Sequence, residues 1–382
     1  MPDFKREINM ELLYEIWLHA ICDFDPGLAT KVVPRFERRK MGFSSPELNM
    51  LELRDAGVSE KIVDRIGEPE YFKKATDIIE YCRDNGIRII TQKSEEYPKA
   101  LHNISVAPRL LFAKGRKLEL NDVASVSVSG SRRPSDQGKV IARGIGRSLA
   151  ENGIVTVSGM AEGIDAEAHW GAIEGGGITI AVLAGGVDMI YPKSNQKLYR
   201  EIIKHGTVIS ERPPGTVGRD YFYQQRNRLV VGLGFGTVFV EGGIKSGTSM
   251  TARLALENDR DIFAVPGNPM NPNAGLPNQL IAEGAIVVNT PDVPAEYYRT
   301  QNPELFKSIP QIPVFEEFEK AVLTEEDKIV KYLREKGDAV ALDKISETLG
   351  IAVSTLNGKL TVLAIKGIVR QESGNRYIIA KK

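Results

Sequence analysis

The sequence predicts an α/β protein built on a Rossmann-like, doubly wound and mostly parallel sheet. From residue 83 to 290, short β-branched apolar runs alternate with stretches of helix length. That alternation is typical of a parallel sheet covered by helices on both faces. Residues before this region have helical periodicity and few β-branched runs, and residues after it read as helices followed by a hairpin. We therefore expect a small all-helical domain in front and a winged helix-turn-helix behind.

The front domain is expected over residues 1–82. Within it, LRDAGVSEKIVDRI (53–66) reads as a helix, a glycine-containing turn and a second helix. This is the arrangement of a helix-hairpin-helix or SAM-like module. A compact bundle that serves only as a docking surface is equally consistent, because Gly57 stands alone where a phosphate-binding hairpin usually has Gly-x-Gly.

The central domain should contain eight strands with helices between them. The expected strands are 87–91, 123–129, 154–158, 178–184, 207–210, 237–241, 261–265 and 285–289. The expected helices are 139–153, 163–176, 195–206, 225–234, 249–259 and 276–284. Each helical stretch separates two strand candidates, as a doubly wound fold requires.

The last part of the chain begins with a proline-rich stretch, 291–322, which suits a linker. Residues 323–382 then predict three helices and two strands around Ser373-Gly374-Asn375, a hairpin turn. Three helices with a β-wing make a winged helix. Its third helix offers only Lys359 and Lys366 as cations, so duplex contact and protein contact both stay open.

Composition narrows the class of partner. The 382 residues contain 50 Lys and Arg and 50 Asp and Glu, so the formal net charge is zero. A nucleic-acid site must therefore be a local concentration of cations. The two cysteines, Cys22 and Cys82, support neither a disulfide framework nor a thiolate metal site. We find no signal peptide and no apolar run of about eighteen residues, so we expect a cytoplasmic protein without a membrane segment.

Glycine-rich polar loops follow five of the expected strands, at 129–138, 158–165, 184–192, 210–215 and 241–249. Ligands of doubly wound sheets bind beyond the carboxyl ends of the strands, and helix N-termini there attract anions. Several cations lie in or near these loops: Arg132, Arg133, Lys139, Lys193, Arg212, Arg226, Arg228 and Lys245. A phosphate-binding rim is the favoured interpretation, although a single glycine can serve the turn alone. Tyr191, Tyr221, Phe222 and Tyr223 could stack on bases or cap the sheet edge.

Catalytic patterns are sparse. The sequence has neither G-x-G-x-x-G after a strand nor a P-loop, so we expect no nucleotide cofactor, no metal and no catalytic residues. Asp165 and His169 share a helical face, and we expect a buried hydrogen bond between them; a general base is the less favoured alternative. Glu211 and Glu241 each end a strand, where we expect them to brace Arg226 or Arg228; acid–base catalysis is the less favoured alternative.

The loop motifs occur in a recognisable order: SVSGSRRPSDQG, SGMAEGIDAEAHWGAI, LAGGVDMIYP, ISERPPG, QQRNRLVVGLGFGTVFVEGGIKSGTS and AGLPNQLIAEGAIVV. In that order and spacing, residues 85–290 resemble the DNA-processing protein family DprA, also called Smf. The helical front and the winged-helix tail fit the fuller members of that family. The resemblance implies a protein of natural transformation that binds incoming single-stranded DNA without being an enzyme. It also implies a homodimer through the Rossmann-like domain, displacement of single-strand-binding protein and loading of the RecA recombinase.

The resemblance assigns DNA-binding residues by motif. The GSR loop, the following glycine loop, the RNR motif and the SG[ST] turn correspond to Gly130, Ser131, Arg132, Gly163, Arg226, Asn227, Arg228, Ser246, Gly247 and Thr248. We add Tyr223 as a stacking residue and Lys245 as a nearby cation. The family usually has Phe-Pro before RNR, where this chain has Tyr223-Gln224, and Asp136 and Gln137 replace the usual small and aromatic residues after GSR.

Two other functions remain open. The GG-x2-SGT turn also resembles the phosphate loop of phosphoribohydrolases, which cleave nucleoside monophosphates. Those enzymes place a glutamate two residues after the turn, whereas this chain has no acid before Glu257. A ligand-responsive regulator that reads duplex DNA through the winged helix is the third possibility, and the few cations of the third helix argue against it.

Overall fold

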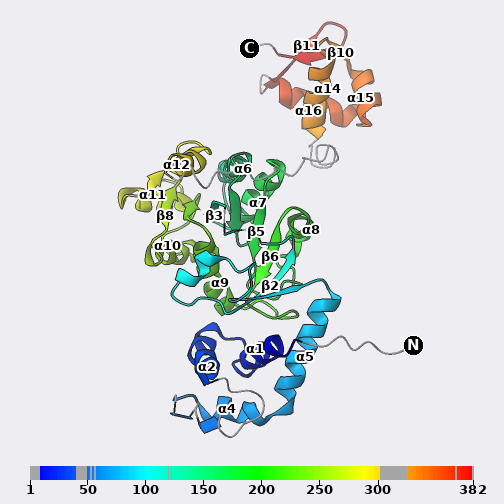
Figure 1. Ribbon diagram of the computed structural model, residues 1–382. Helices are drawn as coiled ribbons and strands as arrows, with labels where there is room; N and C mark the ends of the chain where they lie inside the picture. The colour runs from blue at the N-terminus through cyan, green and yellow to red at the C-terminus, as the bar shows by residue number, and fades with distance from the viewer. Residues whose placement is uncertain are drawn as a thin grey trace, which may run out of the picture. The chain divides into compact units, whose positions relative to one another are not determined.

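The computed structural model describes residues 9–39, 50–51, 54–55, 57–118, 120–121, 123–301, 325–365 and 368–380. The chain forms two compact units, Met1–Pro313 and Val314–Lys382 (Figure 1). In the first unit a helical front, in blue, adjoins a large sheet with helices on both faces. Among the residues that the structure describes, no helix has the length and apolar character needed to cross a bilayer.

The sheet has nine strands in the order β1-β2-β6-β5-β4-β3-β7-β8-β9. They are β1 (Arg88–Thr91), β2 (Leu110–Gly115), β3 (Ser125–Ser129), β4 (Val155–Ser158), β5 (Thr179–Val182), β6 (Thr207–Ser210), β7 (Gly236–Phe239), β8 (Asp261–Ala264) and β9 (Ile286–Val287). From β6 to β9 all neighbours are parallel. The predicted mostly parallel, doubly wound α/β class is confirmed.

Strand β2 is absent from the strands expected above. It pairs antiparallel with both β1 and β6, and its residues Leu110 to Ala113 are buried. A short apolar run that is buried on both faces has no alternation to reveal it as a strand. The sheet therefore has an antiparallel edge that the sequence did not predict.

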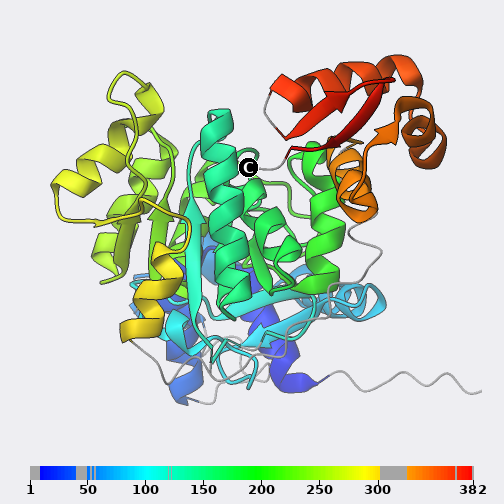
Figure 2. The same ribbon diagram turned by 90° about the horizontal axis from the view of Figure 1, so that it is seen from above.

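Two sets of helices cover the sheet (Figure 2). One set contains α6 (Asp136–Glu151), α7 (Ile164–Glu174) and α8 (Gln196–His205), and the other contains α9 (Asp220–Leu233), α10 (Gly247–Glu257) and α11 (Gly275–Ala282). The crossovers from β3 through β6 contain the first set, and the chain returns from β6 to β7 through α9, which begins the second set. Apolar clusters fill both interfaces, one around Val128 and Ile145 and another around Val157 and Leu229.

Helix α12 (Val293–Gln301) lies where we expected the linker to begin. It contacts α6 and buries Ala295 and Tyr298 in the core, and the Tyr298 hydroxyl donates a hydrogen bond to Asp261 at 2.7 Å. The compact unit thus extends past residue 290. Residues 302–322 of the expected linker lie outside the described residues.

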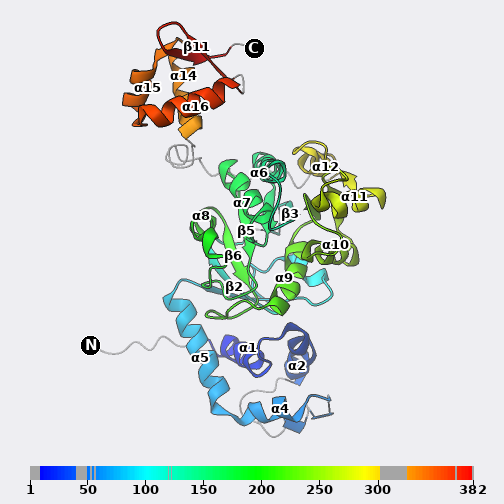
Figure 3. The same ribbon diagram turned by 180° about the vertical axis from the view of Figure 1, so that it is seen from behind.

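The helical front contains α1 (Met10–Ile21), α2 (Pro26–Arg39), α4 (Glu60–Val63), the 3-10 helix η1 (Asp64–Gly67) and α5 (Pro69–Asp84) (Figures 1 and 3). Gly57 has a positive φ of 70°, as the predicted turn requires. The helix after that turn has four residues and continues as a 3-10 helix. Residues 53 and 56 of the proposed helical hairpin lie outside the described residues.

The second unit has three helices and a three-stranded sheet. Its elements are α14 (Glu325–Lys336), β10 (Val340–Ala341), α15 (Leu342–Leu349), α16 (Val353–Ile365), β11 (Val369–Glu372) and β12 (Arg376–Ile379). The sheet is antiparallel in the order β10-β12-β11, and positive φ angles at Gly374 and Asn375 reverse the chain between β11 and β12. The three helices and hairpin match the expected winged helix; Lys366 lies outside the described residues.

Candidate nucleic-acid interface

A cavity of about 710 Å³ lies at the carboxyl ends of β3, β4 and β7. β4 and β7 flank β3 in the sheet, so this is the point where the strand order reverses and where doubly wound proteins bind ligands. Three predicted motifs meet there. The lining includes Gly130, Ser131, Arg132, Asp165, Tyr223, Arg226, Asn227, Ser246, Gly247 and Thr248.

Backbone hydrogen bonds hold the GSR loop from two sides. The Ser131 N–H donates to the carbonyl oxygen of Glu241 at 2.7 Å, and the Ile164 N–H donates to the carbonyl oxygen of Ser131 at 3.2 Å. A Cβ on Gly130 would lie 2.6 Å from the Ile164 side chain, so only glycine fits. The loop that carries Arg132 is therefore held between β7 and the start of α7.

Gly163 begins α7 beside this loop without lining the cavity. It has a φ of +80°, and a Cβ there would lie 2.4 Å from the carbonyl oxygen of Ser131. Both its conformation and its close contact require glycine. Its role in the structure is to bring the N-terminus of α7 against the GSR loop.

Tyr223 presents an aromatic ring between two cations. The guanidinium carbon of Arg132 lies 5.3 Å from the ring centroid and that of Arg226 lies 6.0 Å from it, within cation–π distance. The centroid of the exposed Tyr191 ring lies 6.1 Å from that of the Tyr223 ring. Because α9 begins at Asp220, Tyr223 sits in its first turn and not in a preceding loop. Of the three consecutive aromatics, only Tyr223 lines the cavity.

Arg226 is a buried cation without an ion-pair partner within salt-bridge distance among the residues described. Its guanidinium donates to the carbonyl oxygen of Val182 at 2.5 Å, while its Nε atom has no hydrogen-bond partner. A Cβ on Gly159 would lie 2.0 Å from this guanidinium, so glycine is required to make room for it. Burial lowers the pKa of Arg226, and nearby Asp165 opposes that effect. Such a group is stabilised by an added anion.

The N-terminus of α10 forms another wall. Ser246 precedes the helix, and its hydroxyl donates to the carbonyl oxygen of Gly243 at 2.6 Å. Gly247 is exposed, with open space where a Cβ would lie. The positive end of the helix dipole and its N–H groups thus point toward the cavity. Asn227 links α9 to this helix by donating to the Thr251 hydroxyl at 3.1 Å. Lys245 is exposed nearby and does not line the cavity.

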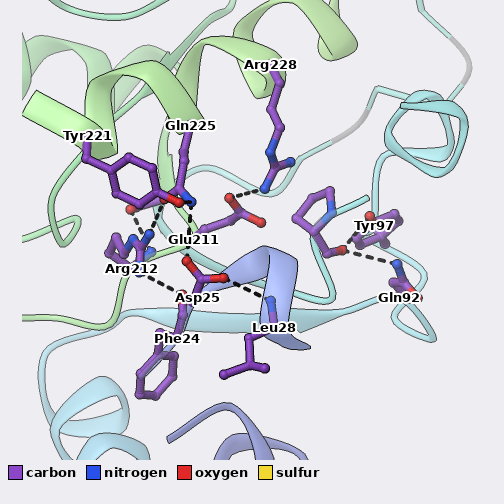
Figure 4. A network of polar contacts seen from close by, with 12 residues as sticks. Phe24, Asp25, Leu28, Gln92, Tyr97, Glu211, Arg212, Tyr221, Gln225 and Arg228 are labelled. Atoms are coloured by element: carbon purple, nitrogen blue, oxygen red, sulfur yellow. Dashed lines mark hydrogen bonds and ion pairs between the residues drawn. The ribbon is translucent and has the colours of Figure 1, made fainter. Parts of the chain in front are cut away.

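Arg228 lies away from the cavity, on another side of α9. Its guanidinium forms an ion pair with Glu211 at 2.5 Å, and both side chains are about 90% buried (Figure 4). Glu211 therefore braces an arginine, as predicted. Burial raises the pKa of Glu211, and Arg228 opposes that effect. The RNR motif is divided, since only its first two residues reach the cavity.

Two predictions about supporting residues are wrong. Among the residues that the structure describes, Glu241 pairs with no arginine; its carboxylate accepts hydrogen bonds from the N–H and the hydroxyl of Ser135, at 2.9 and 2.5 Å, at the start of α6. The reason is that β7 ends beside the β3–α6 loop. Asp165 does not bond His169 either: its carboxylate accepts from the N–H groups of Gly159 and Ala161.

His169 instead pairs with a neighbouring strand. Its Nδ1 lies 2.6 Å from the Thr179 hydroxyl on β5. Burial lowers the pKa of His169 to about 3, so it is neutral at physiological pH. Helical spacing predicted the shared face correctly but could not reveal that the adjacent strand offers a closer partner.

Three further residues that shape the cavity were not predicted. Asn273 comes from the segment before α11; its carbonyl oxygen accepts from the Gly242 N–H at 2.6 Å, and its side chain donates to the carbonyl oxygen of Arg133 at 3.0 Å. Thr251 lines the cavity from α10, and Gly159 makes room for Arg226. A glycine directly after a strand was a usable signal for Gly159, whereas Asn273 had no signal of its own.

The α10 turn, Ser246 to Thr248, is followed by Ser249 and Met250, where phosphoribohydrolases place a glutamate. Glu257 is the last residue of α10, about 15 Å along the helix axis from Gly247 at 1.5 Å per residue. The carboxylates that line the cavity are Asp165 and Asp220. Among the residues that the structure describes, no three potential metal ligands cluster together.

Comparison with known families decides the class. The family model described as "DNA recombination-mediator protein A" matches residues 88–298, more than half of the chain. The chain belongs to this family. The matched range includes every residue that we assigned to the DNA site, from Gly130 to Thr248.

Several curated relatives support this family assignment. DNA processing protein DprA of Bacillus subtilis (strain 168) is 36% identical over 271 residues, covering 70% of this chain and 89% of the relative. DprA of Streptococcus pneumoniae (strain ATCC BAA-255 / R6) is 41% identical over 202 residues, 53% of this chain and 71% of the relative. Protein Smf of Synechocystis sp. (strain ATCC 27184 / PCC 6803 / Kazusa) is 26% identical and spans 97% of this chain and 99% of its own length.

Two solved structures of the DprA family are similar to this chain. The X-ray structure of DprA from Streptococcus pneumoniae has a TM-score of 0.60 at 32% identity and covers 76% of this chain and 98% of its own. A structure of DNA processing protein A from Helicobacter pylori has a TM-score of 0.51 at 29% identity and covers 56% of this chain and 97% of its own. The Helicobacter pylori structure gives insight into the single-stranded DNA binding mode of that protein.

Proposed function

We propose that the protein binds single-stranded DNA in the cavity at the carboxyl ends of β3, β4 and β7. The observation that carries the proposal is the Tyr223 ring flanked by the guanidinium groups of Arg132 and Arg226, at 5.3 and 6.0 Å. An aromatic face beside phosphate-binding cations holds a strand without reading its sequence. The single-stranded DNA binding of the Helicobacter pylori relative supports the same ligand.

Each wall of the cavity has a part in this proposal. A base stacks on Tyr223, while Arg132 contacts a phosphate from the exposed rim. Arg226, which lines the cavity, and the N-terminus of α10 receive a second phosphate. Asn227 keeps α9 and α10 in register by its hydrogen bond to Thr251. The protein acts by binding and positioning, with no chemical step.

The proposal also covers the proteins that share the single-stranded DNA with this one. We infer that the protein acts in the cytoplasm during natural transformation as a homodimer through the Rossmann-like domain, displaces single-strand-binding protein and loads the RecA recombinase. The family description, recombination mediator, supports this role. RecA-driven strand exchange on DNA coated with single-strand-binding protein should accelerate when the protein is added. Unchanged exchange, despite tight DNA binding, would contradict the loading role alone.

Fluorescence anisotropy tests the DNA site. A labelled oligo-dT strand is titrated with the wild type, with Arg132→Ala and with Arg253→Ala, at about 50 and 200 mM salt and with duplex as competitor. Arg253 is the matched control, because its side chain is 80% exposed and pairs with Glu257 away from the cavity. We expect salt-sensitive, strand-selective binding that Arg132→Ala weakens and Arg253→Ala preserves. Binding that is insensitive to salt, or equal in both variants, would contradict the site.

A further inference from the structure

A row of exposed cations lies on α8, the helix that follows Tyr191 in the chain. The helix buries Leu198, Tyr199 and Ile202, so Lys197 and Arg200 lie on its exposed side. Lys204 continues the row one turn further and pairs with Glu201 at 2.9 Å. Within the described part of the chain, Lys197 and Arg200 form no ion pair with an acid. Exposed cations at helical spacing, without acidic partners, offer contacts to successive phosphates.

Trp170 of α7 accompanies this row. The Lys197 ammonium lies 5.9 Å from the centroid of the indole ring, and the ring is partly exposed. Helices α7 and α8 pack against each other, so the ring and the cations belong to one surface. A partly exposed tryptophan beside cations repeats, on a second surface, the combination found at Tyr223.

Two connections link the cavity to α8 and α7. Tyr191 is 62% exposed, its ring lies 6.1 Å from that of Tyr223, and it immediately precedes the turn that leads into α8. On the other side, α7 begins beside the GSR loop through the bond from the Ile164 N–H to Ser131. Glu162 is an exposed acid of this region, and it accepts a hydrogen bond from the Ser194 hydroxyl at 2.6 Å.

We propose that the α8 surface, made of Trp170, Lys197 and Arg200, is a second DNA subsite. A strand held at Tyr223 continues over Tyr191 to this surface, where a base stacks on Trp170 and phosphates contact Lys197 and Arg200. The inference rests on the proposed function, since the strand must first occupy the cavity. It predicts that strands longer than the cavity gain affinity and contact Trp170.

Intrinsic fluorescence tests this subsite. The chain has two tryptophans, and Trp17 is 3% exposed, so quenching by DNA reports on Trp170. We compare dT strands of about six nucleotides, near the lower end of typical single-strand site sizes, and of about 25 nucleotides, above their upper end. The long strand should quench the fluorescence of the wild type and the short strand should not. Trp170→Phe should abolish the quenching and keep binding measurable by anisotropy.

The salt dependence of DNA affinity, measured after Lys197 and Arg200 are replaced, tests the subsite a second way. Lys197→Ala/Arg200→Ala should lower the slope of log affinity against log salt by about 1.4 for the long strand, at about 0.7 per lost phosphate contact, and leave the short strand unchanged. Arg83→Ala/Lys117→Ala removes equal charge from exposed ion pairs elsewhere and should change neither strand.

The outcomes separate the two proposals. If the wild type binds both strands with equal affinity and without quenching, the α8 subsite is overturned while the cavity stands. An unchanged salt slope in Lys197→Ala/Arg200→Ala overturns the subsite as well. If the wild type binds neither strand, the proposed function fails and the subsite fails with it.

Discussion

Two arginines of α9, only two residues apart, have opposite surroundings. Arg226 and Arg228 are each 7% exposed, but they point about 200° apart around the helix, at about 100° per residue. Arg228 forms an ion pair with the carboxylate of Glu211, whereas Arg226 donates to a backbone carbonyl and has no ion-pair partner within salt-bridge distance among the described residues. Each guanidinium also has one buried nitrogen without a hydrogen-bond partner there, Nε of Arg226 and Nη1 of Arg228. In a buried ion pair the charge of the cation is already compensated, whereas a buried cation without an ion-pair partner is stabilised when it binds an anion. Within the RNR motif, Arg228 therefore stabilises the fold and Arg226 is the candidate DNA-binding residue.

The supporting side of α9 extends to the helical front (Figure 4). Arg212, which follows β6, donates to the carbonyl oxygen of Phe24 at 2.7 Å and also bonds Gln225 of α9. Gln225 in turn donates to Asp25 at 3.4 Å, and Asp25 accepts from the Leu28 N–H at 2.9 Å at the start of α2. One side of α9 is therefore fixed to the front domain while the other lines the cavity.

Removing the carboxylate that pairs with Arg228 should cause the largest loss in the free energy of unfolding. Glu211→Ala leaves a buried cation unpaired and should lower the free energy of unfolding by about 3–5 kcal/mol. Urea denaturation measures this loss, and DNA affinity at low temperature, where the variant is still folded, should stay near that of the wild type. A variant of normal stability that no longer binds DNA would reverse the roles assigned to the two arginines.

Removing the cavity arginine should weaken binding. Arg226→Ala should reduce affinity for oligo-dT by roughly 10- to 100-fold, because a charge-assisted contact contributes about 1.5–3 kcal/mol. Its free energy of unfolding should change far less than that of Glu211→Ala. Anisotropy and urea denaturation on the same preparation provide both numbers, and unchanged affinity would remove Arg226 from the site.

A substitution at Gly159, next to the Arg226 guanidinium, tests whether the position of Arg226 matters for DNA binding. In Gly159→Ala the new Cβ would lie 2.0 Å from the guanidinium, so Arg226 must move. We expect a loss of about 1–3 kcal/mol in stability together with weaker DNA binding. Gly215→Ala, at a glycine with open space around it, tests what backbone strain alone costs, since its φ is +78°. Equal DNA affinity in both variants would contradict the role of Gly159.

The pH dependence of stability should identify Asp165, a buried carboxylate close to Arg226. Burial raises the pKa of Asp165 above 3.8, so the folded state binds its proton more tightly than the unfolded state. Stability is then lost as the pH rises from the unfolded-state pKa to the raised one, by about 1.4 kcal/mol for each pH unit that separates them. Compared with Asp165→Asn, the wild type should lose stability as the pH rises above about 4. A relative gain would mean that Arg226 outweighs burial.

Sequence patterns predicted the central sheet, the winged-helix elements and the meeting of three motifs at one edge. These features depend on local periodicity and on where strands end, which a single sequence records. The antiparallel strand β2 and the packing of α12 were missed, since a short buried run and a proline-rich segment look the same whether or not they join a core. The partners of Glu241 and Asp165 and the position of Arg228 outside the cavity were missed, because they depend on which loops the fold brings together.

The most direct test of the central claim compares Arg226→Lys with Arg228→Lys in one DNA titration. Lysine keeps the positive charge but loses the planar fork of the guanidinium. We predict that Arg226→Lys binds oligo-dT several-fold more weakly, while Arg228→Lys binds like the wild type and is only less stable to urea. Equal losses of affinity in two folded variants would contradict the division of α9 into a binding side and a supporting side.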